Sequence, residues 1–409
     1  MKKLNYIDLF AGCGGLSDGF ETSNKYNILA AVEWEKKPLK TLEERLSKHY
    51  NIKNADKVCL NFDIQRTEEL FNGWNDEKYG NNRGLAKIIN NKKVDFIIGG
   101  PPCQAYSVAG RIRDENGMSF DYRNYLFESY IKVVSKIKPS IIVFENVPGL
   151  LSAKPNGINI VEKIREEFNR NGYEILEKLN GAIIDVSDYG VPQYRKRIII
   201  VGLRKELFSG RNIQNILNDF YKNILPKYKS KKMTVRDAIS DLPKLYPEIN
   251  GNNVHYTSQD NNFIDHISRQ HSIRDITIFQ KLAMDKEQKL NQYNDTESIK
   301  QLYYEATGKW SNIHKYHVID WDEPSTTIVA HLHKDGLRHI HPDPKQARSI
   351  TVREAARLQS FDDSFEFFGS RSDAYKMIGN AVPPKFAKCL ANGLFDFFNK
   401  YLIDLESEK

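Results

Sequence analysis

Two short, almost uninterrupted apolar runs constrain the fold of this chain more than any other feature. They are "DFII" at residues 95–98 and "IIVF" at residues 141–144. A strand with one face in water alternates apolar and polar side chains, whereas a strand covered on both faces is apolar throughout. The two runs therefore predict strands of a parallel sheet that has helices on both sides.

Residues 1–203 alternate such strands with helical stretches. Apolar residues recur at helical spacing in residues 125–137 and 160–173. A repeated order of strand and then helix is typical of a doubly wound α/β domain with a mostly parallel sheet. The strand candidates are residues 5–10, 26–34, 94–100, 140–146 and 195–203.

The pattern changes after residue 203. Residues 204–345 are rich in Asn, Lys, Tyr and Asp and have weak periodicity, which indicates a second, irregular domain. Regular structure returns at residues 351–361, where Thr351 is a candidate N-cap and Glu354 its capping-box partner. The last predicted element is an amphipathic helix over residues 384–402.

Composition excludes several classes of protein. The chain of 409 residues is 40% hydrophobic and 28% charged, as in ordinary globular proteins, and no apolar run reaches the ~18 residues that cross a membrane. The four cysteines form no CxxC pair, which argues against a zinc knuckle or a disulfide framework. The net charge of +7 is compatible with an anionic partner. We expect a cytoplasmic protein without a membrane segment or a bound metal.

A glycine-rich loop, "DLFAGCGGLSDGF" at residues 8–20, follows the first strand and precedes a helix. Such a loop lets a ligand approach the backbone beside a helix N-terminus. The second strand ends in Glu33 and Trp34; a carboxylate there can hold ribose hydroxyls, and a tryptophan can stack on a base. The pattern indicates a nucleoside-containing ligand, with NAD and S-adenosylmethionine both open. A tight turn packed against a helix is the structural alternative.

The segment "GGPPCQAYS" at residues 99–107 places Cys103 directly after the third buried strand. Open α/β sheets bind ligands at this edge, beyond the carboxyl ends of their strands. Pro101 and Pro102 restrict the backbone before the thiol. A rigid, exposed thiol indicates a nucleophile, although an incidental loop cysteine remains an alternative.

Two further polar groups follow neighbouring strands. Glu145 and Asn146 end the run "IIVFEN", at the same sheet edge as Cys103, so Glu145 is a candidate for proton transfer. Arg195 and Arg197 are two residues apart on an extended segment and are therefore expected on one side of it. They can clamp a phosphate or the polar edge of a base, unless they only begin a solvated strand.

Together these motifs resemble the bacterial-type DNA (cytosine-5)-methyltransferase family. The segments that carry the resemblance occur in the order of that family and cover residues 4–203 and 348–394. They are "DLFAGCGG", "GGPPCQAYSVAGR", "FENVPGL", "VPQYRKRIIIVG", "RSITVREAARLQSF" and "IGNAVPP".

The resemblance implies the fold of S-adenosylmethionine-dependent methyltransferases and a role for each catalytic residue. Cys103 would add as a thiolate to C6 of a flipped-out cytosine, so that C5 attacks the methyl group of S-adenosyl-L-methionine. Glu145 would hold or protonate N3. Arg195 would contact the O2 side of the base, and Arg197 would support the pocket.

The resemblance also implies cofactor and DNA contacts. Phe62 stands where the family often has glycine, which leaves the turn before Asp63 open. The expected cofactor-binding residues are Phe10, Gly12, Gly15, Glu33, Trp34, Asp63, Ile64, Pro102, Leu126, Asn380 and Val382. The expected DNA-binding residues are Gln104, Ser107, Arg111, Gln193, Thr327, His331 and His333.

The resemblance divides the chain into a catalytic and cofactor-binding domain (1–203), a target-recognition domain (204–347), a hinge that supports the recognition domain (348–370) and a C-terminal return to the catalytic domain (371–409). Within the recognition domain, "VAHLHKDGLRHIH" (329–341) predicts a β-hairpin that turns at Asp335 and Gly336. A hairpin at a DNA groove, a purely structural hairpin and a zinc site all remain open.

The expected function is sequence-specific methylation of double-stranded DNA by a monomer. The expected context is restriction–modification beside a cognate endonuclease, without a stable complex between the two. A tRNA methyltransferase and a catalytically silent DNA-binding protein are alternatives. A NAD-dependent oxidoreductase fits the glycine loop but leaves the Pro-Cys-Gln and Glu-Asn-Val segments unexplained.

Overall fold

The computed structural model describes residues 3–102, 126–154, 157, 159–251, 253–258, 262–311 and 315–403. Contacts between residues divide the chain into two compact units. Unit 1 comprises Met1–Tyr189, Lys196–Ser230 and Ala381–Lys409, and unit 2 comprises Gly190–Arg195 and Lys231–Asn380. The chain thus enters unit 2 briefly at residues 190–195, and helix α15 near the C-terminus returns to unit 1.

Unit 1 is built on one mixed sheet with the strand order β3-β2-β1-β6-β7-β10-β8, and β9 pairs with β10. The pairs from β3 to β7 are parallel, and β10 is antiparallel to its three neighbours. The chain leaves β1 toward β2 and then returns to β6 on the other side of β1, which makes this point a topological switch point. The strands are β1 (Leu4–Leu9), β2 (Tyr26–Glu33), β3 (Cys59–Asn61), β6 (Phe96–Gly99), β7 (Ile141–Asn146), β8 (Tyr173–Ile175), β9 (Ile183–Asp185) and β10 (Lys196–Arg204).

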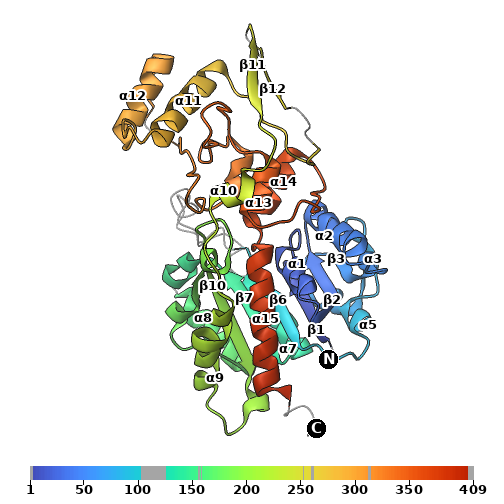
Figure 1. Cartoon of the computed structure of the whole chain (residues 1–409). Coiled ribbons are helices and arrows are strands. Elements are labelled where there is room, and N and C mark those ends of the chain that lie inside the picture. The colour runs from blue at the N-terminus through green and yellow to red at the C-terminus, as the bar shows by residue number, and fades with distance from the viewer. Residues whose placement is uncertain are drawn as a thin grey trace. The chain divides into compact units, whose positions relative to one another are not determined.

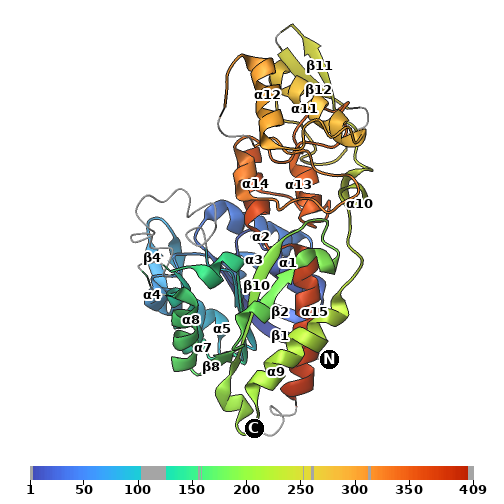
Figure 2. The ribbon, with the colours of Figure 1, turned by 90° about the vertical axis from the view of Figure 1, so that its left-hand side faces the viewer.

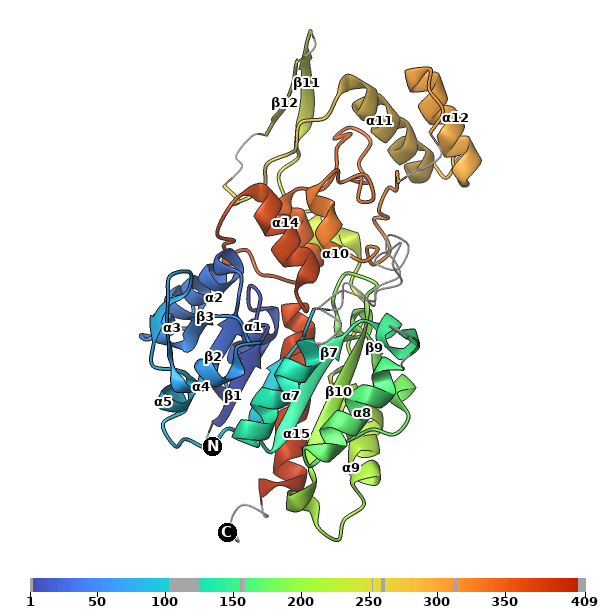
Figure 3. The same cartoon turned by 180° about the vertical axis from the view of Figure 1, so that it is seen from behind.

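Helices cover both faces of this sheet. Helices α1 (Gly15–Thr22) and α15 (Pro384–Tyr401) lie on one face, as Figure 1 shows. Helices α4 (Thr67–Asn72), α7 (Leu126–Ile137) and α8 (Ile160–Arg170) lie on the other (Figure 3). Unit 1 also contains α2 (Lys36–Lys48), α3 (Ala55–Val58), α5 (Leu85–Ile89), α9 (Ile213–Asp219), the short hairpin of β4 (Trp74–Asp76) and β5 (Gly80–Asn82), and the single-turn helices η2 (Pro148–Ser152), η4 (Leu179–Ala182), η5 (Val186–Tyr189), η6 (Lys205–Phe208), η7 (Phe220–Ile224) and η8 (Leu225–Tyr228).

The predicted doubly wound fold is confirmed. The two apolar runs lie at the centre of the sheet as β6 and β7, where Ile97, Ile98, Ile141 and Ile142 are completely buried. The last strand candidate corresponds to β10, which runs against its neighbours. This reversal makes the sheet mostly rather than entirely parallel.

The described residues of unit 2 form helices and one hairpin. Helices α11 and α12 pack on each other, and Val254 of β12 joins the buried cluster that they form with Phe279, Val318 and Ile340. Figure 2 shows the hairpin, α11 and α12 within this unit. The elements are α10 (Val235–Ile239), β11 (Tyr246–Asn250), β12 (Asn253–Thr257), α11 (Ile273–Glu287), α12 (Thr296–Thr307), η9 (Ala330–His333), α13 (Val352–Leu358) and α14 (Arg371–Asn380).

Helix α13 begins as predicted, with a capping box. Thr351 Oγ1 accepts a hydrogen bond from the Glu354 amide at 3.1 Å, and Glu354 Oε2 accepts one from the Thr351 amide at 2.7 Å. The same carboxylate accepts hydrogen bonds from both terminal nitrogens of Arg348, each at 2.7 Å, and both side chains are buried. The capping box therefore also closes a buried ion pair.

The predicted hairpin over residues 329–341 is wrong. Residues 330–333 form the single helical turn η9, and the chain after it is irregular apart from isolated bridges at Ile340. His339 and His341 are almost fully buried in unit 2, as is Ile340 between them, so the alternating pattern does not correspond to the two faces of a strand. In the part of the chain that the structure describes, no three His, Cys, Asp or Glu side chains converge as metal ligands do.

None of the helices in the described part of the chain combines the length and the apolar character that a bilayer-spanning segment needs.

Candidate active site

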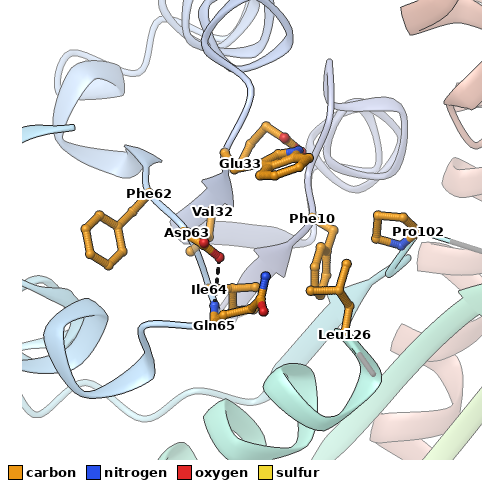
Figure 4. Close-up of a pocket in the computed structure, with 10 residues that line it drawn as sticks. Phe10, Val32, Glu33, Phe62, Asp63, Ile64, Gln65, Pro102 and Leu126 are labelled. Atoms are coloured by element: carbon orange, nitrogen blue, oxygen red, sulfur yellow. Dashed lines mark hydrogen bonds between the residues drawn. The ribbon is translucent and has the colours of Figure 1, made fainter. Parts of the chain in front are cut away.

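A pocket of unit 1 opens at the carboxyl ends of β1, β2 and β3, beside the start of α7 (Figure 4). The space between its lining residues, including the part that is open to solvent, is about 340 Å³. Ligands of open α/β sheets bind at this edge, next to a topological switch point. The lining residues are Phe10, Val32, Glu33, Trp34, Phe62, Asp63, Ile64, Gln65, Pro102 and Leu126.

Glu33 ends β2 with its carboxylate held by backbone amides. Oε2 accepts a hydrogen bond from the Gly12 amide and Oε1 one from the Glu35 amide, both at 2.9 Å. Burial raises the pKa of Glu33 to about 7 despite these bonds. The glycine loop therefore serves the pocket indirectly, because its Gly12 amide orients the carboxylate.

Trp34 follows Glu33 and lines the same pocket with 42% of its surface exposed. Asn61, which sequence reasoning missed, holds both residues in place. Its Nδ2 donates to the Glu33 carbonyl at 3.0 Å and to the Trp34 carbonyl at 2.9 Å. No motif marks this asparagine; its role follows from the pairing of β3 with the end of β2.

The opposite part of the pocket is the segment after β3. Asp63 Oδ1 accepts a hydrogen bond from the Gln65 amide at 3.0 Å, drawn as a dashed line in Figure 4. Phe10, in the left-handed region with φ of 60°, lies beside Leu126 and Pro102 on one side of the pocket (Figure 4). Val32 and Gln65 also line it and were not expected from the sequence.

Four predicted cofactor residues are not among those that line the pocket. Gly12 bonds Glu33, and Asn380 belongs to unit 2. Gly15 is a packing position, since a Cβ added there would stand 2.2 Å from the Val382 carbonyl oxygen. Gly15 and Val382 are thus brought together, but as the contact between the first loop and the segment that precedes α15.

Glu145 at the end of β7 forms an ion pair with Arg197 on β10. Glu145 Oε1 lies 2.9 Å from Arg197 Nε, and each side chain is 13% exposed. Gly100 allows this carboxylate its position, because a Cβ there would stand 2.6 Å from Glu145 Oε2. The adjacent Asn146 donates to the Pro101 carbonyl at 3.3 Å.

The segment before Cys103 is therefore held between two parts of the site. Pro101 is bonded by Asn146, next to the Glu145–Arg197 pair, and Pro102 lines the pocket. Cys103 itself and the expected DNA contacts Gln104, Ser107 and Arg111 lie outside the described residues.

Arg195 and Arg197 do not act as a pair. Arg195 is 1% exposed and donates to the carbonyl oxygens of Ile328 at 2.9 Å and Gly379 at 3.0 Å, all within unit 2. Arg195 directly precedes β10, which begins at Lys196, and binds carbonyl groups of unit 2, whereas Arg197 binds Glu145 of unit 1.

Gln193 is also interior. It is completely buried, donates to Gln359 Oε1 at 2.5 Å and accepts from the Ile328 amide at 2.9 Å. The structure therefore places its amide in the interior of unit 2 and not at a surface that DNA reaches. Thr327, half-buried, donates to the Tyr194 carbonyl at 2.7 Å.

His331 and His333 lie on the turn η9. The two rings are in edge-to-face contact with centroids 5.9 Å apart. His333 Nδ1 lies 2.7 Å from the Ala330 carbonyl and donates to it. Both side chains are partly exposed.

Comparison with known proteins identifies the family. A family model described as C-5 cytosine-specific DNA methylase matches residues 4–396. The type II methyltransferase M.Bpa9945I of Bacillus paralicheniformis is 34% identical, with 96% of this chain and 99% of the relative covered. The type II methyltransferase M1.HphI of Haemophilus parahaemolyticus is 31% identical, with 96% and 86% covered.

A solved structure supports the fold. The crystal structure of the S. pombe Dnmt2 methyltransferase matches with a TM-score of 0.53 at 16% identity, covering 98% of this chain and 100% of that one. The strand order of the sheet and the position of the pocket are consistent with the family that the sequence matches indicate. The chain belongs to the C-5 cytosine-specific DNA methylase family and is a DNA (cytosine-5-)-methyltransferase.

Proposed function

We propose that this enzyme transfers a methyl group from S-adenosyl-L-methionine to C5 of a flipped-out cytosine through a covalent bond between Cys103 and C6. One observation carries the proposal. The two prolines before Cys103 connect the nucleoside pocket, which Pro102 lines, with the Glu145–Arg197 pair, beside which Asn146 bonds Pro101. Because Cys103 directly follows these prolines in the sequence, we infer that its thiol acts beside both the methyl donor and a group that can polarise the base.

The residues of the pocket fit S-adenosyl-L-methionine. Glu33 offers a carboxylate to the ribose hydroxyls, and Trp34 offers an exposed ring face to the adenine. Asp63 and Ile64 would hold the adenine edge, since only one carboxylate oxygen of Asp63 is used by the Gln65 amide. Phe10 and Leu126 would cover the methionine end of the ligand. The bound cofactor supplies an electrophilic methyl group.

In the reaction, the Cys103 thiolate adds to C6, and the electron pair of the 5,6 double bond becomes available at C5. Glu145 would donate a hydrogen bond or a proton at N3, so that the ring accepts this charge. Glu33 and Trp34 would hold the donor so that it supplies its methyl group to C5 and keeps the electron pair of the broken carbon–sulfur bond. A base removes the C5 proton, and the electron pair restores the double bond as the thiolate leaves.

The arginine roles differ from those expected from the sequence. Arg197 is bonded to Glu145, so we assign the contact with the O2 side of the base to Arg197. Arg195, with its guanidinium bound to two carbonyls of unit 2, would maintain the fold of that unit.

The target cytosine must leave the duplex, because its C5 and C6 are inaccessible in the stack. We propose that unit 2 recognises the DNA sequence and that unit 1 performs the chemistry. The type II names of the relatives support a role in restriction–modification. We propose further that the enzyme acts as a monomer and forms no stable complex with its endonuclease, which sedimentation of the enzyme alone and with the endonuclease tests.

Labelled cofactor and defined substrates test the proposal. The enzyme should transfer label to duplex DNA but not to tRNA, and Cys103→Ser should lose turnover while it still binds DNA. DNA with 5-fluorocytosine at the target should form an adduct that survives denaturation, because fluorine does not leave as a proton does. Cys389→Ser, on α15, is the matched control and should remain active. Turnover by the Cys103 variant, or label found in tRNA alone, contradicts the proposal.

A further inference from the structure

The side chain before the pocket segment Asp63–Gln65 is a completely buried phenylalanine, Phe62. Its backbone amide donates to the Glu33 carbonyl at 3.2 Å, which attaches this point to the end of β2. Its ring is turned away from Phe10 and the interior of the pocket, as Figure 4 shows. The position of Phe62 therefore sets the position of Asp63, and contacts outside the pocket hold Phe62.

Three residues make those contacts with the ring of Phe62. Trp74 stacks on one face, with centroids 4.1 Å apart and planes at 24°. The guanidinium of Arg66 lies 4.7 Å from the ring centroid. Tyr79 packs edge-on at 5.3 Å. A ring that is stacked, capped by a cation and approached edge-on has few alternative positions.

These contacts connect Phe62 to the β4–β5 hairpin, although Arg66 also donates to Glu69 of α4 at 2.8 Å. Trp74 lies on β4 and donates from Nε1 to the Tyr79 carbonyl at 3.2 Å, which ties the hairpin across its turn. Asp76, also on β4, accepts from Arg66 Nη1 at 2.6 Å. Figure 2 shows β4 beside α4 at this edge of unit 1. The hairpin thus holds both the ring of Phe62 and the residue that follows the pocket segment.

We propose that Trp74 is a positioning residue of the cofactor pocket. Through Phe62 and Arg66, the β4–β5 hairpin braces the Asp63–Gln65 segment against the end of β2, so that Asp63 meets the adenine edge. This inference rests on the proposed function, which assigns the pocket to S-adenosyl-L-methionine. The hairpin itself does not touch the ligand.

Calorimetry with two product analogues tests the brace. S-adenosylhomocysteine carries the adenine amino group, and S-inosylhomocysteine has a carbonyl oxygen in its place. Wild-type enzyme should bind the adenosyl compound more tightly. Trp74→Ala should weaken binding of S-adenosylhomocysteine about three- to tenfold, as loss of an aromatic pair does. Binding of the inosyl compound should weaken less, so that the ratio of the two affinities becomes smaller. Trp74→Phe should retain most of the wild-type preference for S-adenosylhomocysteine.

The controls separate positioning from general destabilisation. Leu217→Ala removes a fully buried side chain of α9 that does not line the pocket, and should leave both affinities unchanged. If Trp74→Ala does not fold, Asp76→Asn, which removes the hairpin carboxylate that binds Arg66, should reduce the difference in affinity between the two compounds in the same direction. If the folded variants keep the wild-type ratio of affinities for the two analogues, the proposed positioning role of Trp74 is wrong. Failure of the wild type to bind either analogue contradicts the cofactor assignment instead.

Discussion

At the scale of single residues, the carboxylate of Glu33 is oriented for binding, but its burial lowers the stability of the folded protein. Two backbone amides hold its carboxylate, yet burial raises its pKa to about 7 from an ordinary 4.5. The pKa of the nearby Asp8 is also raised to about 7, mainly by burial. A buried carboxyl that ionises near neutrality destabilises the folded state unless a ligand shares its hydrogen bonds.

Cofactor affinity should depend on pH through Glu33. Ribose hydroxyls favour the ionised carboxylate, so the affinity for S-adenosylhomocysteine should rise as pH increases toward 7 and level off above it. Glu33→Gln should bind more weakly and without this pH dependence. Calorimetry between pH 5.5 and 8.5 measures both curves, and parallel curves would disprove the role of Glu33.

The stability of the ligand-free enzyme should respond in the opposite direction. Because the folded pKa is raised, the stability that Glu33 contributes is complete below pH 4.5 and is lost as pH rises through 7. Glu33→Gln should therefore gain stability relative to wild type over this window, by up to about 3 kcal/mol. Urea unfolding at pH 5 and pH 8 measures the difference, and a constant difference contradicts the linkage.

The two arginines before and within β10 should have separable effects. Arg197→Ala removes the partner of Glu145 and should lower kcat about 10- to 100-fold, as loss of a charged hydrogen bond does, with a small change in unfolding free energy. Arg195→Ala leaves two interior carbonyl oxygens without a donor and should cost on the order of 3 kcal/mol of stability. Kinetics and urea unfolding of both variants test this, and equal behaviour would refute the assignment.

At the scale of elements, helix α13 is anchored by charge as well as by its cap. Burial raises the pKa of Glu354, but the bidentate Arg348 guanidinium outweighs burial and holds that pKa well below its ordinary value. His341, 3.5 Å from the same carboxylate, has its pKa lowered to about 3, chiefly by burial, and is neutral at pH 7. The single ion pair therefore fixes the start of α13.

Breaking that pair should be severe. Glu354→Gln leaves Arg348 buried and uncompensated, which typically costs about 3–5 kcal/mol. Asp237→Asn changes a comparable capping box on α10, but an exposed one, and should have a much smaller effect. Urea unfolding at pH 7 compares the two. Because the pKa of Glu354 is depressed, the loss should persist down to pH 4.5 and shrink only below it.

At the scale of the whole molecule, the two ends of the described chain share one core. The Tyr26 hydroxyl of β2 donates to the Ala391 carbonyl of α15 at 2.7 Å, and a Cβ on Gly19 of α1 would stand 2.4 Å from Ala387 Cβ. Helix α15 thus belongs to unit 1 although more than a hundred residues of unit 2 precede it.

Separating these helices should destabilise both ends together. Gly19→Ala forces α1 away from α15 and should cost about 1–3 kcal/mol. Gly181→Ala is the matched control, since its Cβ would meet Leu176 at an ordinary 3.4 Å. Hydrogen exchange should show equal losses of protection in β1, β2 and α15. Loss of protection in α15 alone would mean that this helix does not unfold cooperatively with the strands of unit 1.

The sequence by itself determined the central strands, the helices around them and the capping box of α13, because burial on both faces and local capping leave direct residue patterns. It also located Glu33 and Trp34 at the end of the second strand, whereas Asp63 was indicated only by the resemblance to the family. Each motif is a contiguous stretch of sequence, so the motifs and their order can be read without the tertiary structure.

Only the tertiary structure decided which groups meet. The sequence pairs Arg195 with Arg197, but their partners lie far away along the chain, at Gly379 and Glu145. Asn61 and Trp74 carry no motif, and the histidines at residues 331 and 333 alternate along the sequence although they lie on a helical turn and not on a strand. Contacts between distant segments depend on how the elements pack, and side-chain spacing along the chain does not encode that packing.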